Sequence, residues 1–209
     1  AGPEAATPGT DGGAVSGRAV TAPCQVPVAW RIGFVDSRFG LHGSELRSAV
    51  EEAVALWESA AGRELFRHDP HEGMPVDLVY DERQRQLAEQ VEAEERLDRW
   101  EAELAHRPRT APEVERYNRL VDRYNAALDE YRALPTLQFQ VAEYSHKLES
   151  GSGRIVQRRV TVWAMDSRTG LVTALAHEMA HALGLGHVSD PSALMTAEGD
   201  ASQVTEAAL

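Results

Sequence analysis

The sequence predicts an α/β fold with a parallel component, from which an antiparallel helical hairpin projects. Three observations lead to this prediction. Between residues 28 and 80, apolar residues follow in turn the spacing of a strand, a helix and two further strands. From about residue 82 to residue 133 the chain is rich in charge, contains no glycine and has apolar residues at helical spacing. A final amphipathic helix is predicted over residues 171–187, and it contains three histidines.

The length of 209 residues suits one domain with an insertion. Residues 1–23 consist mainly of Gly, Ala, Pro and Thr and have almost nothing to bury, which predicts a flexible linker. A single domain would then cover residues 24–209, with the helical hairpin inserted at about residues 82–134. No apolar run reaches the roughly 18 to 20 residues that a membrane span needs.

The first strand is predicted over residues 28–36, because four apolar residues alternate along it and share one face: Val28, Trp30, Ile32 and Phe34. A helix follows, with Ser44 at its N-cap and Gly62 at its C-terminal cap. Its buried stripe recurs at spacings of three and four: Leu46, Val50, Ala53, Trp57 and Ala60. Shorter strands are predicted at residues 64–67 and 76–80.

Two helices are predicted within the hairpin. The apolar positions of the first are Leu87, Val91, Leu97, Trp100 and Leu104. Those of the second are Val114, Tyr117, Leu120 or Val121, Tyr124, Leu128 and Tyr131, and Pro112 suits its start. Residues 106–111 separate the two helices. Packing of the helices against each other accounts for both apolar stripes, and docking of a protein partner on the hairpin is the alternative.

The segments on either side of the last helix are less regular. Residues 136–150 fit either a strand or an extension of the second hairpin helix past Pro135, and the pattern does not separate these alternatives. Residues 154–165 predict one or two strands, and the turn-rich segment 166–170 leads into the helix that carries the histidines. The final residues, SQVTEAAL, predict a short C-terminal helix.

The charge and the cysteine count exclude several classes of function. The chain has 21 basic and 33 acidic residues, a formal net charge of -12, which argues against binding to nucleic acids or anionic membranes. The single cysteine, Cys24, excludes an intrachain disulfide and a multi-cysteine metal site. The chain has one lysine, two isoleucines and abundant alanine and arginine, a composition typical of a GC-rich, bacterial genome.

The last helix carries a metal-binding pattern. His177 and His181 are four residues apart, so both imidazoles lie on one helical face and can reach the same ion. Gly184 allows the chain to leave the helical conformation, and His187 can then return as a third nitrogen ligand. Three protein ligands leave the fourth position of a tetrahedral site open, which is the arrangement of a catalytic zinc site.

Glu178 lies beside this pattern without being a ligand, and its carboxylate is suited to take a proton from a zinc-activated water and return it to a leaving amine. The alternatives are three histidines that merely hydrogen-bond in a core, and a zinc site that has lost its activity.

The motif His177-Glu178-x-x-His181-x-x-Gly184-x-x-His187, followed by VSDPSALM, resembles the metzincin zinc endopeptidases and, among them, the matrixins, the family of the matrix metalloproteinases and their bacterial relatives. The resemblance covers roughly residues 28–80 and 153–209. It implies a mixed, mostly parallel twisted sheet with an active-site helix, one catalytic Zn²⁺ and peptide or protein substrates. It also implies that Met195 forms an apolar floor under the zinc and that residues 188–196 shape the wall of the substrate pocket. Val188 and Thr196-Ala197 depart from the usual pattern of the family.

The resemblance raises further expectations. A substrate should lie antiparallel to an edge strand, expected within residues 153–158. Loops that hold structural zinc and calcium are not recognisable, so a calcium requirement stays open. His68, Asp69 and His71 either bind a second metal or are solvated loop residues. Cys24 is either a latency ligand of the zinc or an incidental thiol, and it lacks the neighbours of the usual switch motif. We expect the protein to be exported, and its oligomeric state and cleavage preference stay open.

The sequence therefore predicts a zinc-dependent endopeptidase. The alternative is a binding or assembly protein that uses the helical hairpin, with the zinc domain as an inactive or latent scaffold. Hydrolysis of a non-protein amide is a second enzymatic alternative.

Overall fold

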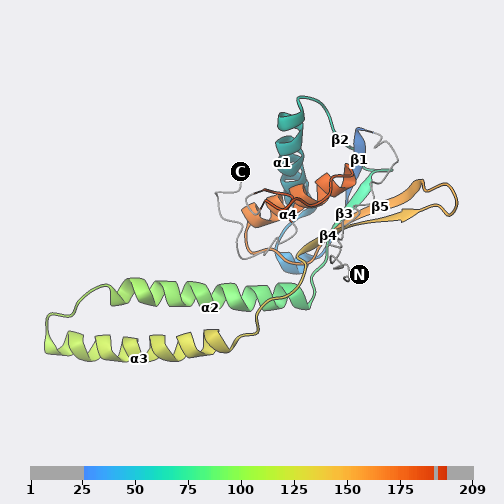
Figure 1. Ribbon diagram of the computed structural model, residues 1–209. Helices are drawn as coiled ribbons and strands as arrows, with labels where there is room; N and C mark the ends of the chain where they lie inside the picture. Colours follow the sequence, from blue (N-terminus) through green and yellow to red (C-terminus); the bar gives the residue numbers. More distant parts are fainter. Residues whose placement is uncertain (1–25, 191–192, 197–209) are drawn as a thin grey trace, which may run out of the picture.

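The computed structural model describes residues 26–190 and 193–196. Its centre is a five-stranded sheet in the order β2-β1-β3-β5-β4 (Figure 1). Four strands are parallel: β1 Val28–Val35, β2 Phe66–His68, β3 Met74–Leu78 and β5 Ile155–Val162. β4, Ala142–Leu148, is antiparallel to β5. The predicted mixed, mostly parallel sheet is confirmed.

Two helices cover one face of this sheet, α1 Gly43–Ala61 and α4 Arg168–Ala182 (Figure 1). Their apolar faces and the inner face of the sheet form one continuous core. The nine largest side chains in it that are less than 2% exposed are Leu46, Val50, Val76, Leu78, Val160, Val162, Leu171, Leu175 and Met179. The indole N–H of Trp57 donates to the carbonyl of Ala176 at 2.8 Å, so α1 also holds α4 by a hydrogen bond one residue before His177. The helix that carries the histidines is therefore fixed on two sides.

The first strand differs from its prediction at one position. Val28 and Trp30 are buried as expected, but the Phe34 side chain is 58% exposed. The register of β1 against β3 shifts between Ile32 and Val35, and Val35, not Phe34, packs against the core. A register shift of this kind reverses the face on which the following side chains lie, which accounts for the exposed phenylalanine.

A buried carboxylate joins the central strands on the other face. Asp77 in β3 is 3% exposed, and its Oδ1 accepts the backbone N–H of Phe34 at 2.7 Å. Its Oδ2 pairs with the guanidinium of Arg159 in β5. Gly33 faces this carboxylate, and a Cβ atom at that position would overlap Asp77 Oδ1. The pair therefore depends on a glycine in the neighbouring strand.

The first helix begins two residues earlier than predicted. Its N-cap is His42 and not Ser44, and the Glu45 carboxylate accepts the His42 backbone N–H at 2.8 Å. This contact between the third helical residue and the N-cap backbone, as in a capping box, fixes the start of the helix at Gly43. The C-terminal prediction is confirmed, since Gly62 caps the helix with φ of 64°.

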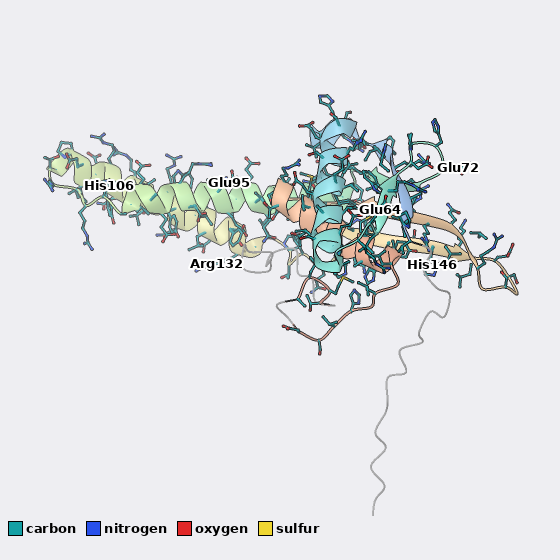
Figure 2. All side chains as sticks on the ribbon, turned by 90° about the horizontal axis from the view of Figure 1, so that it is seen from above. Glu64, Glu72, Glu95, His106, Arg132 and His146 are labelled. Atoms are coloured by element: carbon teal, nitrogen blue, oxygen red, sulfur yellow. The ribbon has the colours of Figure 1, made fainter. Side chains whose placement is uncertain are left out.

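Two helices leave the sheet between β3 and β4: α2 Glu82–Leu104 and α3 Ala111–Ala133. They lie antiparallel and project from the rest of the molecule, with His106 at the far end (Figures 1 and 2). The Tyr131 hydroxyl donates to Glu94 across the pair at 2.5 Å. At the base, the Gln84 side chain accepts the Met165 N–H at 2.7 Å, and the Arg83 guanidinium lies 3.8 Å from the centre of the Trp163 ring. The first turn of α2 thus anchors the hairpin to the segment that precedes α4.

The segment for which strand and helix were both possible contains a strand. β4 begins at Ala142, and α3 ends at Ala133 without passing Pro135. Residues 154–165 contain one strand, β5, and it is not an edge of the sheet. The predicted substrate-binding edge within residues 153–158 is therefore wrong, because β4 pairs with that side of β5 and itself becomes the edge.

Three predictions fall outside the described residues: the linker over residues 1–23, the environment of Cys24, and the short helix in SQVTEAAL. Among the helices that are described, none has the length and apolar composition to cross a membrane.

Candidate metal centre

The histidines come from α4 and the turn that follows it. The Ser167 side chain caps the helix by accepting the Gly170 N–H at 3.0 Å. His177 and His181 then lie one turn apart on the same face, as their spacing predicts. The helix ends at Ala182, and Gly184 has φ of +86°, a left-handed conformation that glycine adopts without strain. This reversal brings His187 back to the other two.

The three Nε2 atoms form a nearly equilateral triangle. The distance is 3.2 Å between His177 and His181, 3.1 Å between His177 and His187, and 3.1 Å between His181 and His187. In a tetrahedral site with zinc–nitrogen bonds of about 2.0 to 2.1 Å, neighbouring ligand atoms are about 3.3 to 3.4 Å apart. The triangle therefore has the size that three imidazole ligands of one zinc ion require.

Hydrogen bonds made by the other ring nitrogen, Nδ1, orient the Nε2 atoms of His177 and His181 towards a common point. Nδ1 of His177 lies 2.7 Å from the carbonyl oxygen of Leu194, and Nδ1 of His181 lies 2.8 Å from that of Leu185. A carbonyl can only accept, so both Nδ1 atoms carry the proton and both Nε2 atoms carry a lone pair. Lone pairs that converge at this distance repel one another unless a cation lies between them. Burial lowers the pKa of His177, which favours the neutral form that binds metals.

The glutamate of the motif is held at the edge of the sheet. Glu178 is 8% exposed, and its Oε2 accepts the backbone N–H of Tyr144 in β4 at 2.6 Å. Burial raises the pKa of the carboxyl, and the Tyr144 hydrogen bond opposes this shift in part. The carboxylate thus has a fixed orientation and an environment that increases its affinity for a proton.

The turn after the histidines folds back against α4. Met195 is 6% exposed, and its carbonyl accepts the Val188 N–H at 2.7 Å. The neighbouring residue, Leu194, supplies the carbonyl that orients His177. The described residues of this turn, 188–190 and 193–196, are therefore joined by the Val188–Met195 hydrogen bond and connected to the metal-binding cluster through Leu194.

The sequence profile of the matrixins matches residues 25–207. The chain belongs to the matrixin family. A comparison with curated proteins finds no match to this matrixin. Membership implies a zinc-dependent metallopeptidase, a hydrolase whose substrates are peptides or proteins, and the three histidines are compatible with the catalytic zinc of that family.

Of the two alternatives for His68, Asp69 and His71, the described residues favour an ordinary loop and do not support a second metal site. Asp69 Oδ1 accepts the N–H groups of His71 and Glu72, at 2.9 and 3.1 Å, and so caps its own turn. The His68 ring packs edge-on against Trp30, with ring centres 4.8 Å apart. Within residues 26–190 and 193–196, the only group of three potential ligands close enough to hold one ion is His177, His181 and His187.

Sequence reasoning missed the groups that orient the site of this matrixin. The carbonyls of Leu185 and Leu194 and the N–H of Tyr144 are backbone groups, which every residue carries. Trp57 was predicted only as a core residue, and its hydrogen bond to α4 had no signal in the sequence.

We predict that His187→Ala lowers the zinc affinity of this matrixin by more than about 100-fold, because losing a ligand should cost more than the 10- to 100-fold typical of losing a group that orients one. Zinc content after dialysis against a competing chelator measures this effect. His106→Ala is the matched control, because His106 lies at the tip of the hairpin, away from the cluster (Figure 2). Equal zinc retention by both variants would contradict the ligand assignment.

Proposed function

We propose that this protein is a zinc-dependent endopeptidase in which Glu178 transfers the proton during peptide hydrolysis. The observation that supports it is the convergence of three histidine Nε2 atoms, 3.1 to 3.2 Å apart, next to a buried glutamate that the edge strand holds in place. Such a cluster combines an open metal position with a positioned general base.

His177, His181 and His187 would hold a zinc ion, and its Lewis acidity would polarise the scissile carbonyl and acidify a water molecule. Glu178 accepts a proton of that water as the water oxygen bonds to the carbonyl carbon. The same carboxylate then delivers the proton to the amide nitrogen as the carbon–nitrogen bond breaks. The second proton of the water also passes to the released amine, which leaves an ammonium group and a carboxylate. Atoms and charge balance with one water consumed for each peptide bond.

The Tyr144 N–H holds one oxygen of Glu178, so the other oxygen is available for proton transfer. Because the Tyr144 N–H points away from β5, alternate residues of β4 present their backbone groups to the open edge. The intervening residues face β5: the Val141 carbonyl accepts the Trp163 N–H, and the Glu149 N–H donates to Arg154. Towards the end of β4, the next residue after Tyr144 whose backbone groups face this edge is therefore His146. A substrate segment that lies antiparallel to β4 would pair there and pass Glu178.

Metal analysis combined with a digest of a peptide library, with and without a chelator, tests the proposal. We expect about one zinc per chain and cleavage that the chelator abolishes and added zinc restores. Zinc-loaded protein that cleaves no peptide in the library would overturn the endopeptidase assignment.

The hairpin supports a second candidate function, that of a binding or assembly protein. In Figures 1 and 2 the outer parts of α2 and α3 lie side by side and project away from the sheet, which leaves a long surface available to a partner. A variant with a shortened hairpin can test this function. It should keep the base of the hairpin, because Gln84 and Arg83 contact the domain and Glu94 bonds Tyr131.

Replacing residues 96–128 by a short glycine linker should leave the kcat/KM for small peptides within about twofold of the full chain, since no described contact of the metal cluster involves the removed residues. Peptide cleavage kinetics of both proteins, at equal zinc content, measure this. A loss of peptide cleavage by a folded, zinc-loaded variant would show that the hairpin takes part in the reaction. Loss of a bound protein with peptide cleavage intact would favour the binding function.

A further inference from the structure

A cavity of about 930 Å³ begins at His181 and extends beneath the β4–β5 ribbon. The ribbon forms one wall, the starts of β1 and β3 form another, and the end of α4 closes the side next to the metal cluster. Figure 2 shows His146, on the ribbon, at the side of the domain away from the helical hairpin. The cavity is therefore continuous with the candidate metal centre and lies on one side of it only.

The direction of β4 identifies which part of a substrate this cavity would receive. β4 runs from Ala142 to Leu148, and Tyr144, near its start, bonds to Glu178. A peptide antiparallel to β4 has its N-terminal part beside the end of that strand. The residues that precede the scissile bond would therefore lie beside His146 and over the cavity.

The charge of this wall is opposite to that of the whole chain. Residues 142–162 contain four basic residues, Lys147, Arg154, Arg158 and Arg159, and two acidic ones, Glu143 and Glu149, whereas the net charge of the chain is -12. Two of these arginines, Arg154 and Arg158, line the cavity, and Glu72 is the one carboxylate among the described residues that line it. The cavity thus carries an excess of positive charge close to the metal cluster.

Arg158 differs from the other arginines of the ribbon. Arg154 pairs with Glu149 at 3.3 Å, and Arg159 pairs with Asp77 on the opposite face of the sheet. Arg158 is partly buried, and its guanidinium, unlike those of Arg154 and Arg159, makes no ion pair or hydrogen bond with any other described residue. Its register partner in β4 is His146, whose ring stacks on Tyr144 with centres 5.5 Å apart. The Arg158 guanidinium, which has no counter-ion among the described residues, therefore lies near the rings of His146 and Tyr144. These rings can pack against the aliphatic part of a substrate side chain.

We propose that this cavity binds the substrate segment that precedes the scissile bond and that Arg158 selects an acidic side chain, Asp or Glu, in that segment. The inference rests on the proposed endopeptidase function and names the substrate class of that site. A carboxylate at this position gains a charge-assisted hydrogen bond with a guanidinium that is already partly desolvated. A lysine or arginine there would meet a like charge instead.

The test uses zinc-loaded full-length protein and a matched set of quenched fluorescent peptides. The peptides differ only in having Glu, Gln or Lys at each of the three positions before the cleaved bond. For at least one position we expect a kcat/KM for the Glu peptide about tenfold above that for the Gln peptide, with the Lys peptide lowest. In Arg158→Gln the ratio of Glu to Gln should fall to about one, and in Arg158→Glu the order of Glu and Lys should reverse.

Lys147→Gln is the matched control, because it removes the same charge from the same ribbon at a residue that does not line the cavity. Lys147→Gln should keep most of the wild-type ratio of kcat/KM between the Glu and the Gln peptide. Binding of the uncleaved peptides to zinc-loaded Glu178→Ala, measured by fluorescence anisotropy with and without Arg158→Gln, gives a readout that does not depend on turnover.

The outcomes separate the two proposals. If the wild-type protein cleaves the Gln peptides but shows no preference for Glu, or if Arg158→Gln keeps that preference, the inference about Arg158 is wrong and the endopeptidase function stands. If no peptide is cleaved while the Glu peptides bind in a manner that depends on Arg158, the endopeptidase function is wrong and the acidic preference of the cavity stands.

Discussion

Glu178→Ala should lower the kcat/KM for peptide hydrolysis by about 10³- to 10⁴-fold, because it removes the group that carries the proton from water to the leaving amine. The side chain does not belong to the three-nitrogen cluster, so the zinc content should not change. Initial rates on a fluorescent peptide, with zinc measured on the same samples, give both quantities.

Two further variants sharpen this test. Glu178→Gln keeps the size of the side chain and can still accept the Tyr144 N–H, so it isolates the loss of the ionisable group. Glu130→Ala removes an exposed carboxylate from α3 and should leave the rate unchanged. If Glu178→Gln retains more than about one tenth of the wild-type rate, proton transfer by this residue cannot supply the catalysis assigned to it.

Gly73→Ala should lower the free energy of unfolding by about 2 to 4 kcal/mol, the range expected when a new side chain is forced into packed backbone. Gly73 lies directly before β3, and a Cβ there would lie 2.6 Å from the carbonyl oxygen of Trp30 and 2.7 Å from its Cα. Because these are main-chain atoms of β1, no side chain can rotate away. The two central strands would have to separate.

Urea denaturation of the zinc-saturated protein measures this loss as a lower midpoint at unchanged m-value. Gly43→Ala is the matched control, since its Cβ would meet only Ile32 Cγ2 at 3.8 Å, an ordinary contact. Its stability should stay within about 0.5 kcal/mol of the wild type. Equal midpoints for the two variants would mean that β1 and β3 do not approach each other as closely as described.

The parts of the site that could be predicted from sequence depend on local geometry. The spacing of His177 and His181 determines their common face in any helix, and Gly184 marks the point at which the chain leaves that helix. The end of α1 at Gly62 follows from the same kind of local rule.

The parts that could not be predicted depend on contacts between distant segments. The position of β4 at the edge follows from its pairing with β5, which the pattern of residues 136–158 does not encode. The exposure of Phe34 follows from a register shift against β3. The start of α1 was missed for a different reason, because serine is a favoured N-cap residue and histidine is not, and the contact of Glu45 with His42 places the cap at His42.

The buried pair of Asp77 and Arg159 restricts the order in which the sequence can change during evolution. A side chain at Gly33 would overlap the Asp77 carboxylate, so position 33 is closed to substitution while that carboxylate is present. If Asp77 is lost first, Arg159 is released, and the remaining close neighbour of a Cβ atom at position 33 is Pro75 Cβ at 3.1 Å, a side-chain atom that can shift slightly. Among descendants of this sequence, substitutions at these three positions should therefore accumulate in the order 77 before 33, and residues at 77 and 159 should vary together.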